Sequence, residues 1–201
     1  MNTLDKVRKA PSCKTMGIEI EGALPYDVYN SLPDYCGFFY KGYDGSITGL
    51  RGRNVEFVSQ PLTYPWMQKE IDKLFKKIGP HFSYNDSCGI HVHVSKKWLS
   101  DKKAKEVYAV LKDLTQAELL FLFGRGSSRW TDENIGERYC TVNITNKHTN
   151  EFRVFKSGGR SWALYCVAIS KFMVEHAHHL TSSMLFAFRD DYFLTHEMEA
   201  G

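Results

Sequence analysis

Paired cysteine motifs and long apolar runs are both missing from this sequence of 201 residues. Its five cysteines are widely spaced and odd in number, and they form no Cys-x-x-Cys pair, which argues against a zinc ribbon and against a disulfide framework. No apolar run approaches the length of a transmembrane helix, and the first residues are polar, without the apolar segment of a signal peptide. We therefore expect a soluble, cytoplasmic protein without a membrane partner.

The sequence also carries little net charge. A formal charge of +3 gives no electrostatic reason to expect a nucleic acid as a partner. Hydrophobic residues make up 43% of the chain, which is enough for one substantial core in a chain of this length. Internal repeats, low-complexity segments and linkers are missing, so we predict a single domain over residues 1–201. Within it, residues 1–15 form a polar lead-in, and 181–201 form a short helix and a tail.

Strict alternation of polar and apolar residues predicts strands that have one polar face. In residues 88–95, His91 and His93 alternate with isoleucine and valine, so both imidazoles should point to one face, about 7 Å apart at the Cα atoms. The same alternation places Glu19 and Glu21 on one face of an earlier strand. Two carboxylates this close repel each other and favour a cation between or beside them.

Two further strands add to the same chemical pattern. Glu151 and Arg153 share one face of a predicted strand over residues 151–155, and Glu56 lies opposite the apolar face of a strand over 54–59. A simple ion pair between Glu151 and Arg153 is the alternative to a functional role. A sheet face of acids, imidazoles and guanidinium groups is nevertheless costly unless the charges coordinate something.

Helical periodicity predicts the remaining elements. We expect helices over residues 64–78, from Ser100 to near Phe123, and from Trp162 to about residue 180. The tyrosine-rich stretch 23–43 is predicted as loop with one strand near 38–40, and a strand over 139–144 should form a hairpin with 151–155. Three histidines trail the last of these helices, and a solvated helix end is favoured over a metal site for them: His176, His178 and His179. The elements predict an α+β fold.

A basic, glycine-containing loop follows residue 123. It carries Arg125 and Arg129 and suits a phosphate group, but it is not a Walker A motif, because no Gly-Lys-Ser/Thr follows. Arg138 stands just before the next predicted strand. A loop of this kind could close over a bound ligand.

Several short motifs occur in a fixed order along the chain. They are Gly17-x-Glu19-x-Glu21, Asp44-Gly45-Ser46, Val55-Glu56-Phe57-Val58-Ser59-x-Pro61, Cys88-Gly89-x-His91-x-His93-Val94 and Glu151-Phe152-Arg153. Over about residues 16–175, this set resembles the amidoligase family of the glutamine synthetase and carboxylate–amine ligase superfamily. Many compact members of that family are encoded by bacteriophages or in bacterial gene clusters.

The resemblance implies a fold, a reaction and a set of ligands. The fold would be a curved antiparallel sheet with helices packed on one face, like the glutamine synthetase catalytic domain. ATP would phosphorylate a small-molecule or peptide carboxylate, and an amine would then displace phosphate from the acyl phosphate. Glu19, His91 and Glu151 would hold one Mg²⁺ or Mn²⁺ ion, and Glu21 and Glu56 another. Carboxylate oxygens suit Mg²⁺, and an imidazole shifts the preference toward Mn²⁺ or Zn²⁺.

Basic side chains complete the predicted site. The resemblance implies that His93 touches the nucleotide phosphates or the substrate, and that Arg153 contacts the transferring phosphoryl group. Phosphoryl transfer requires positive charge against the equatorial oxygens, which Arg138 and Arg153 could supply, with Arg125 or Arg129 closing over from the loop. We therefore predict His93, Arg153 and Arg138 as catalytic residues, and His93, Arg153, Arg125 and Arg129 as nucleotide-binding residues.

Two other functions remain open on the sequence. The first is a non-catalytic binding protein on the same scaffold, for example a phage-encoded protein that grips a host protein. The tyrosines between residues 26 and 43 would be its anchors. The second is a metal-dependent hydrolase or nuclease that uses the same ligands to activate water.

Overall fold

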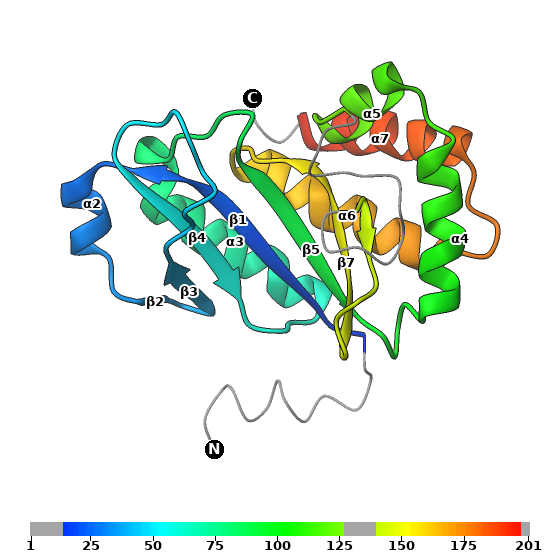
Figure 1. Cartoon of the computed structure of the whole chain (residues 1–201), viewed down its shortest axis with the longest axis horizontal. Coiled ribbons are helices and arrows are strands. Elements are labelled where there is room, and N and C mark those ends of the chain that lie inside the picture. The colour runs from blue at the N-terminus through cyan, green and yellow to red at the C-terminus, as the bar shows by residue number, and fades with distance from the viewer. Residues whose placement is uncertain (1–13, 127–139, 198–201) are drawn as a thin grey trace.

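A seven-stranded antiparallel sheet and six α-helices make up the part of the chain that the computed structural model describes, residues 14–126 and 140–197 (Figure 1). The strands are β1 (Met16–Leu24), β2 (Tyr35–Cys36), β3 (Phe39–Gly42), β4 (Arg53–Ser59), β5 (Gly89–Ser95), β6 (Val142–Asn143) and β7 (Thr149–Lys156). The helices are α2 (Tyr26–Ser31), α3 (Tyr64–Ile78), α4 (Asp101–Lys112), α5 (Gln116–Phe123), α6 (Arg160–His176) and α7 (Ser182–Glu197), with a 3₁₀ turn, η1 (Gly79–His81). The predicted α+β class is confirmed.

The order of strands in the sheet is β2-β3-β4-β1-β5-β7-β6, so the first strand of the chain becomes the central one. β4 and β5 pair with β1 on either side, and β7 pairs with β5. The strands predicted from polar–apolar alternation are therefore direct neighbours. This arrangement brings their polar faces together in the middle of the sheet.

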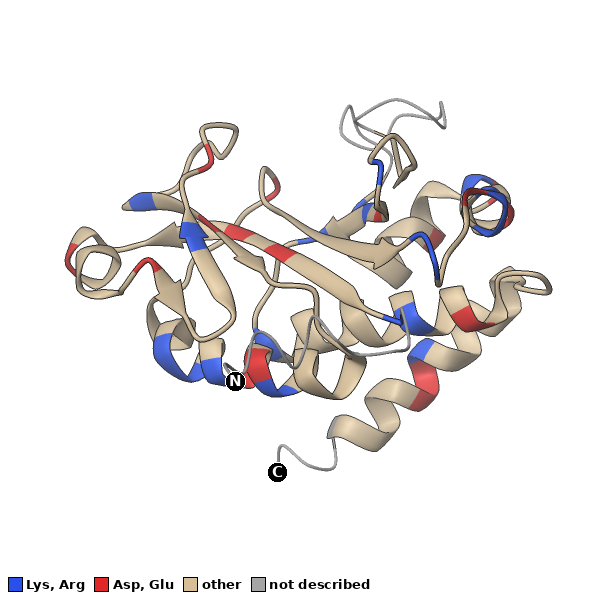
Figure 2. Ribbon diagram, turned by 90° about the horizontal axis from the view of Figure 1, so that it is seen from below, with Lys and Arg blue, Asp and Glu red and all other residues tan. Residues whose placement is uncertain are grey.

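The apolar face of the sheet packs on helices. Ile18 and Ile20 of β1, and Val55 and Phe57 of β4, are almost completely buried. α3 contacts β1, and α6 contacts β5 and α3. Figure 2 shows these two helices as a layer on one side of the sheet, with acidic residues in the strands above them. The alternation in the sequence thus separates a face packed against helices from a polar face.

The predicted helix over residues 64–78 is confirmed with the same bounds as α3. Pro65 stands in its first turn, where a missing N–H costs nothing. Met67, Ile71, Leu74 and Ile78 form the buried stripe. Because these residues recur at three- and four-residue spacing, their burial against the sheet holds the helix in place.

The prediction of one helix from Ser100 to near Phe123 is wrong. The chain forms α4 and α5 instead, because a new helix starts at Thr115. The Thr115 hydroxyl accepts a hydrogen bond from the Glu118 amide, and the Glu118 carboxylate accepts one from the Thr115 amide. This capping box is a start signal in the sequence that outweighs the continuous apolar spacing. Ser100 caps α4 as expected.

The stretch 23–43 is more ordered than the predicted loop. It contains α2 as well as β2 and β3. Lys41 holds α2 in place, because its buried ammonium group donates hydrogen bonds to the carbonyl oxygens of Tyr29 (2.9 Å) and Leu32 (2.7 Å). A lysine that reaches back to the end of a helix satisfies carbonyls that lack partners within it. Such a contact joins a strand residue to a preceding helix, so the periodicity within either element does not reveal it.

The C-terminal part also differs from the prediction. The expected short helix over 181–201 is α7, a helix of 16 residues. Tyr165 of α6 contacts the rings of Phe188, Tyr192 and Phe193 on α7. These aromatic contacts explain the length of α7, because burying the rings against α6 stabilises one side of the helix.

The ends of two other predicted elements shift as well. α6 ends at His176 rather than near residue 180, and the following His178 pairs with Glu106 of α4 on the surface. The predicted strand over 139–144 shortens to β6, which pairs with β7 as the expected hairpin. Residues 1–13, 127–139 and 198–201 lie outside the described residues, and with them most of the predicted lead-in. Among the helices of the described segments, none combines the length and the apolar character needed to cross a bilayer.

Candidate metal and phosphate site

The centre of the candidate site is a carboxylate held between two imidazoles. Glu19 of β1 lies opposite His91 of β5 in the sheet register. Its Oε2 atom is 3.0 Å from Nδ1 of His91, and its Oε1 atom is 2.9 Å from Nε2 of His93. Both imidazoles therefore reach the same side of the sheet, as the alternation predicted. Antiparallel pairing of β1 with β5 is what brings these side chains within hydrogen-bond distance.

β7 adds a second carboxylate to this centre. Glu151 lies opposite His93. It accepts hydrogen bonds from the Asn143 side chain (2.9 Å) and from the Arg153 guanidinium group (2.5 Å). Glu19, His93 and Glu151 each offer one ligand atom, and these atoms lie within 4.8 Å of one another. We call these three residues the mixed cluster.

His91 lies between the mixed cluster and a second group of carboxylates that includes Glu21. It is 4% exposed, and its Nδ1 atom lies 3.6 Å from Oε1 of Glu151. Its Nε2 atom lies 3.7 Å from Oε1 of Glu21. The resemblance assigned His91 rather than His93 to the ion shared with Glu19 and Glu151. The structure brings both imidazoles to Glu19, while His91 alone also faces Glu21 with its second nitrogen.

Three carboxylates form the neighbouring group, which we call the acidic cluster. Glu21 of β1 lies directly opposite Glu56 of β4. Asp44, from the loop after β3, completes the group, with one oxygen of each residue within 4.8 Å of the others. The Gly89 amide donates a hydrogen bond to Oε2 of Glu21 (2.6 Å). Like charges directly opposite in a sheet are destabilising, so this arrangement favours a bound cation.

Asp44 is a site residue that the sequence prediction missed. Its Oδ1 atom accepts a hydrogen bond from the Ser46 amide (2.7 Å). The side chain of Asn54 donates hydrogen bonds to the carbonyl oxygens of Asp44 (3.2 Å) and Ile47 (2.8 Å). The Asp44-Gly45-Ser46 turn was visible as a motif. Alternation assigns a face only to residues within strands, so it could not place this loop carboxylate beside Glu56.

The mixed cluster is balanced within itself. Burial would raise the pKa of Glu19, but hydrogen bonds and charge from His91 and His93 outweigh burial and hold the pKa of Glu19 far below its usual range. Burial would lower the pKa of His93, but the hydrogen bond to Glu19 and the charges of Glu19 and Glu151 raise it. Glu19 and His93 therefore each favour the charged form of the other.

The acidic cluster has no such compensation within it. Burial, followed by the charges of Glu19, Glu21 and Asp44, raises the pKa of Glu56 to about 7. Burial also raises the pKa of Glu21, although the charge of His91 and the Gly89 amide act in the opposite direction. The nearby positive groups do not offset this repulsion for Glu56, and a divalent cation is the partner that would let all three carboxylates ionise.

Two of the predicted arginines lie beside the clusters. Arg153 contacts Glu151, and Nη2 of Arg125 donates a hydrogen bond to the carbonyl oxygen of Cys88 (2.5 Å). A Cβ atom at Gly89 would stand 3.4 Å from Nη1 of Arg125 and only 2.9 Å from Nε2 of His91. The missing side chain at Gly89 therefore makes room for both groups. The other two predicted arginines, Arg129 and Arg138, lie outside the described residues.

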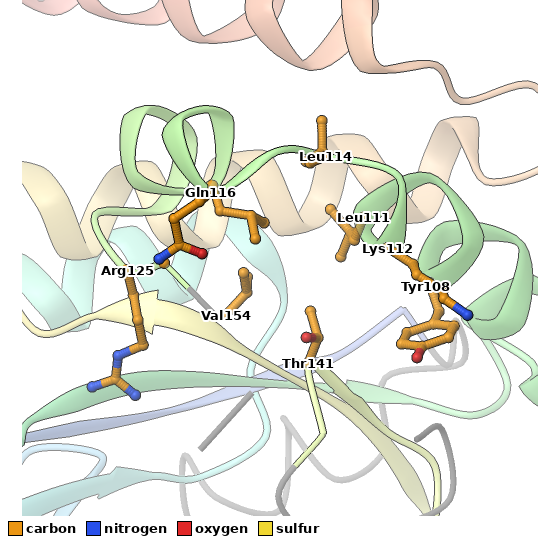
Figure 3. A pocket seen from close by; sticks show the side chains of 10 residues that line it. Tyr108, Leu111, Lys112, Leu114, Gln116, Arg125, Thr141 and Val154 are labelled. Atoms are coloured by element: carbon orange, nitrogen blue, oxygen red, sulfur yellow. The ribbon is translucent and has the colours of Figure 1, made fainter. Parts of the chain in front are cut away.

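A hollow of about 210 Å³ opens beside the mixed cluster, where Glu19 and His93 share its lining with apolar residues such as Val58 and Pro61. A second hollow, of about 220 Å³, lies between α4, α5 and β7, and Arg125 is the predicted site residue in its lining. Figure 3 shows Arg125 extending from the end of α5 toward the strands. Of the two hollows, the first is therefore the one that borders the clusters.

No family model matches the sequence, and neither does any curated protein. The site must therefore be interpreted from its own chemistry. Its donor set is carboxylate oxygens with one or two imidazoles, which suits Mg²⁺ or Mn²⁺. Two such groups side by side, with guanidinium groups next to them, form an arrangement typical of sites that bind phosphates through cations.

Proposed function

We propose that this protein is an ATP-dependent carboxylate–amine ligase that requires Mg²⁺ or Mn²⁺ and has a glutamine synthetase-like catalytic fold. The observation that carries the proposal is the adjacency of the mixed and acidic clusters on one face of neighbouring strands. The order of the motifs along the chain supports a phage or bacterial member of the amidoligase family.

The residues present fit divalent cations. Glu21, Asp44 and Glu56 would hold one ion, since each offers an oxygen within 4.8 Å of the others. The mixed cluster would hold a second ion, with His91 at its border. When bound, such ions neutralise the charge of the ATP phosphates, which is the main electrostatic requirement of phosphoryl transfer.

The reaction that we propose has two steps. An oxygen of the carboxylate substrate attacks the γ-phosphorus of ATP, the bond to the β-phosphate oxygen breaks, and ADP leaves. An amine then attacks the acyl carbon, a C–N bond forms, phosphate departs with the bonding electrons, and the nitrogen releases a proton. In this scheme Arg153 and Arg125 orient the phosphates. Both guanidinium groups are held by hydrogen bonds beside the clusters, so little reorganisation is needed.

The hollow beside the mixed cluster is where we place the acid or the amine. Its walls include the hydroxyl groups of Ser59 and Thr149 as well as Glu19 and His93. Because apolar residues make up much of the remaining wall, the hollow suits a small molecule or the end of a peptide that has both apolar and polar parts. It lies on the same sheet face as the clusters, so a substrate there would border the phosphate site.

Calorimetry on the purified chain tests the proposal. We expect ATP to bind in the presence of Mn²⁺ and not after chelation of the metal. Glu56→Gln should weaken this binding strongly. Glu175→Gln is the matched control, because that carboxylate pairs with Lys171 on the surface of α6. Absence of metal-dependent ATP binding would contradict the proposal.

A product assay then separates ligation from simple nucleotide binding. Mixtures of candidate acids and amines are supplied with ATP and Mn²⁺, and ADP release is measured with each component omitted in turn. A ligase releases ADP in sustained turnover only when acid and amine are both present. Hydrolysis of a substrate without ATP would instead favour a metal-dependent hydrolase.

A binding protein on the same scaffold is the second candidate. The observation that favours it is the exposure of Tyr26, Tyr35, Tyr40 and Tyr43, whose exposed fractions range from 45% to 62%. Exposed tyrosines are good interface anchors, and a host protein would be the partner of a phage-encoded member. Under this proposal, Tyr26→Ala and Tyr43→Ala weaken capture of the partner, whereas Glu56→Gln leaves it intact.

A further inference from the structure

Two of the exposed tyrosines lie on the same face of the sheet as the acidic cluster. Tyr35 of β2 pairs with Tyr40 of β3, and Tyr40 pairs with Val58 of β4. Phe39, next to Tyr40, is completely buried on the opposite, helix-packed face. Val58 and Glu56 are two residues apart in β4 and therefore share a face with Tyr40. The polar face thus continues from the carboxylates to an aromatic pair.

Gly42 joins the aromatic pair to the acidic cluster. It lies opposite Glu56 in the β3–β4 pairing. The point where its Cβ atom would stand is 3.7 Å from Cε1 of Tyr40 and 3.9 Å from Oε2 of Glu56. A tyrosine ring and a cluster carboxylate therefore border the same open space above a glycine. A larger residue at this position would fill that space.

The rings of Tyr35 and Tyr40 differ from those of Tyr29 and Tyr43 in the groups that they contact. The rings of Tyr29 and Tyr43 are faced by cations, Lys41 and Arg53. Within the described residues, the ring contact recorded for Tyr35 and Tyr40 is with each other, at 5.5 Å between centroids. Their exposed fractions are 61% and 45%. These two rings keep a large aromatic surface available beside a site for cations.

We infer that Tyr35 and Tyr40 form a stacking platform for the purine base of the nucleotide whose phosphates reach the acidic cluster. The inference rests on the proposed function. A nucleoside triphosphate carries a planar ring at one end and a chain of metal-binding oxygens at the other, and the face offers a partner for each. Stacking on an aromatic ring uses the π-face that every base possesses, so the platform needs no hydrogen bonds to the edge of the base.

The test compares two ligands that share phosphates but not a base. Binding of ATP and of inorganic tripolyphosphate is measured by calorimetry with Mn²⁺ on the full chain. We expect Tyr40→Ala to weaken ATP binding about tenfold or more, the size of one base–aromatic stack, and to leave tripolyphosphate binding unchanged. Tyr40→Phe keeps the ring and should bind ATP like the wild type. Tyr26→Ala is the control, since Tyr26 is equally exposed but lies on α2.

The outcomes separate this inference from the proposed function. If the wild type binds both ligands and Tyr40→Ala binds ATP undiminished, the platform is ruled out and the proposed function stands. Equal losses of ATP and tripolyphosphate would also overturn the platform, because the defect would then lie in the phosphate site. If the wild type binds neither ligand, the proposed function fails and the inference with it. If circular dichroism shows that Tyr40→Ala does not fold, the same comparison is made with Tyr35→Ala, which lies on the outermost strand, β2.

Discussion

The two clusters on the polar face differ in how their negative charge is balanced. In the mixed cluster, Glu19 is hydrogen-bonded to two imidazoles, and Glu151 contacts Arg153. In the acidic cluster, Glu21 and Glu56 face each other across β1 and β4, and among the described residues the basic group within ion-pair distance of Glu21 is His91, at 3.7 Å. Glu19 and Glu21, one from each cluster, lie two residues apart on the central strand β1. Their contrast therefore comes from their neighbours and not from their depth in the fold.

This difference in charge balance predicts different roles for the two clusters, one in the stability of the fold and one in binding metal. The mixed cluster can be stable without an ion, because imidazole and guanidinium groups already compensate its carboxylates. The acidic cluster remains repulsive until a cation arrives or a proton binds. We therefore expect the acidic cluster to dominate the affinity for metal, and the mixed cluster to dominate the stability of the metal-free protein.

The largest expected effect is a loss of stability in Glu19→Gln. Glutamine can still hydrogen-bond to the rings of His91 and His93 but carries no negative charge, so the imidazoles lose a charged partner in a mostly buried place, at a cost of about 3 kcal/mol. Urea unfolding of the metal-free protein at pH 7.5 measures the free energy of unfolding. A stability equal to that of the wild type would remove the proposed difference between the clusters.

The second expected effect concerns the affinity for Mn²⁺. Asp44→Asn removes one charged ligand from the acidic cluster, and we expect the affinity to fall about a hundredfold, at the upper end of losses caused by changes around a metal site. Asp86→Asn is the control, because Asp86 pairs with Lys156 on the surface. Titration of the ion by calorimetry provides the measurement. Similar affinities for the two variants would exclude Asp44 as a ligand.

The third expected effect depends on pH. The pKa of Glu56 is raised to about 7 in the folded protein, well above its ordinary value of 4.5. Between these values the folded state binds a proton that the unfolded state has lost, so stability from this group is full below pH 4.5 and falls as pH rises through 7. Glu56→Gln should therefore stabilise the metal-free protein at pH 8 by about 2 kcal/mol, which is the pKa difference converted to free energy and reduced for partial solvent exposure, with little change at pH 4.5.

Melting temperatures at the two pH values, with and without Mn²⁺, measure this effect. The ion should raise the melting temperature of the wild type more at pH 8 than at pH 4.5, because it must displace a proton at the lower pH. In Glu56→Gln the metal-free protein should lose most of its pH dependence across this range. A destabilised Glu56→Gln variant at pH 8 would mean that the acidic cluster is compensated after all.

The smallest expected effect comes from Asn54→Ala. Asn54 reaches Asp44 through the backbone of its loop, so this change should loosen the position of Asp44 without removing a ligand. We expect the affinity for Mn²⁺ to fall about tenfold, with the stability of the mixed cluster unaffected. Asn146→Ala, in the turn before β7, is the matched control. An equal loss in both variants would point to a general loosening of the sheet.

Much of the polar face could be predicted, because alternation assigns a side to every residue within a strand. Glu19, His91 and Glu151 were recognised this way, and the structure places them together. The resemblance implied that Glu21 and Glu56 share an ion, but alternation could not predict that they are paired, because which strands are neighbours depends on the packing of the whole sheet. Asp44 was missed for a related reason, since its loop is positioned by Asn54 from another strand.

The helices also show where prediction from residue patterns succeeds and where it fails. α3 was predicted with its exact bounds, because its apolar stripe and its end signals agree. The break between α4 and α5 was missed, although the capping box of Thr115 and Glu118 was present in the sequence. The apolar spacing there runs through the break. Local start signals therefore deserve more weight than continuous periodicity where the two conflict.

The position of β1 at the middle of the sheet has a consequence for the order of events during synthesis. β1 is translated before the other strands of the sheet, yet its neighbour β5 and the next strand, β7, are made much later. At roughly 5–20 residues per second, the delay between Glu19 and Glu151 is on the order of ten seconds. The growing chain lacks the full set of proposed ligands until Glu151 has been translated. Under the proposed function, ions would therefore bind to both clusters only after β7 has been made.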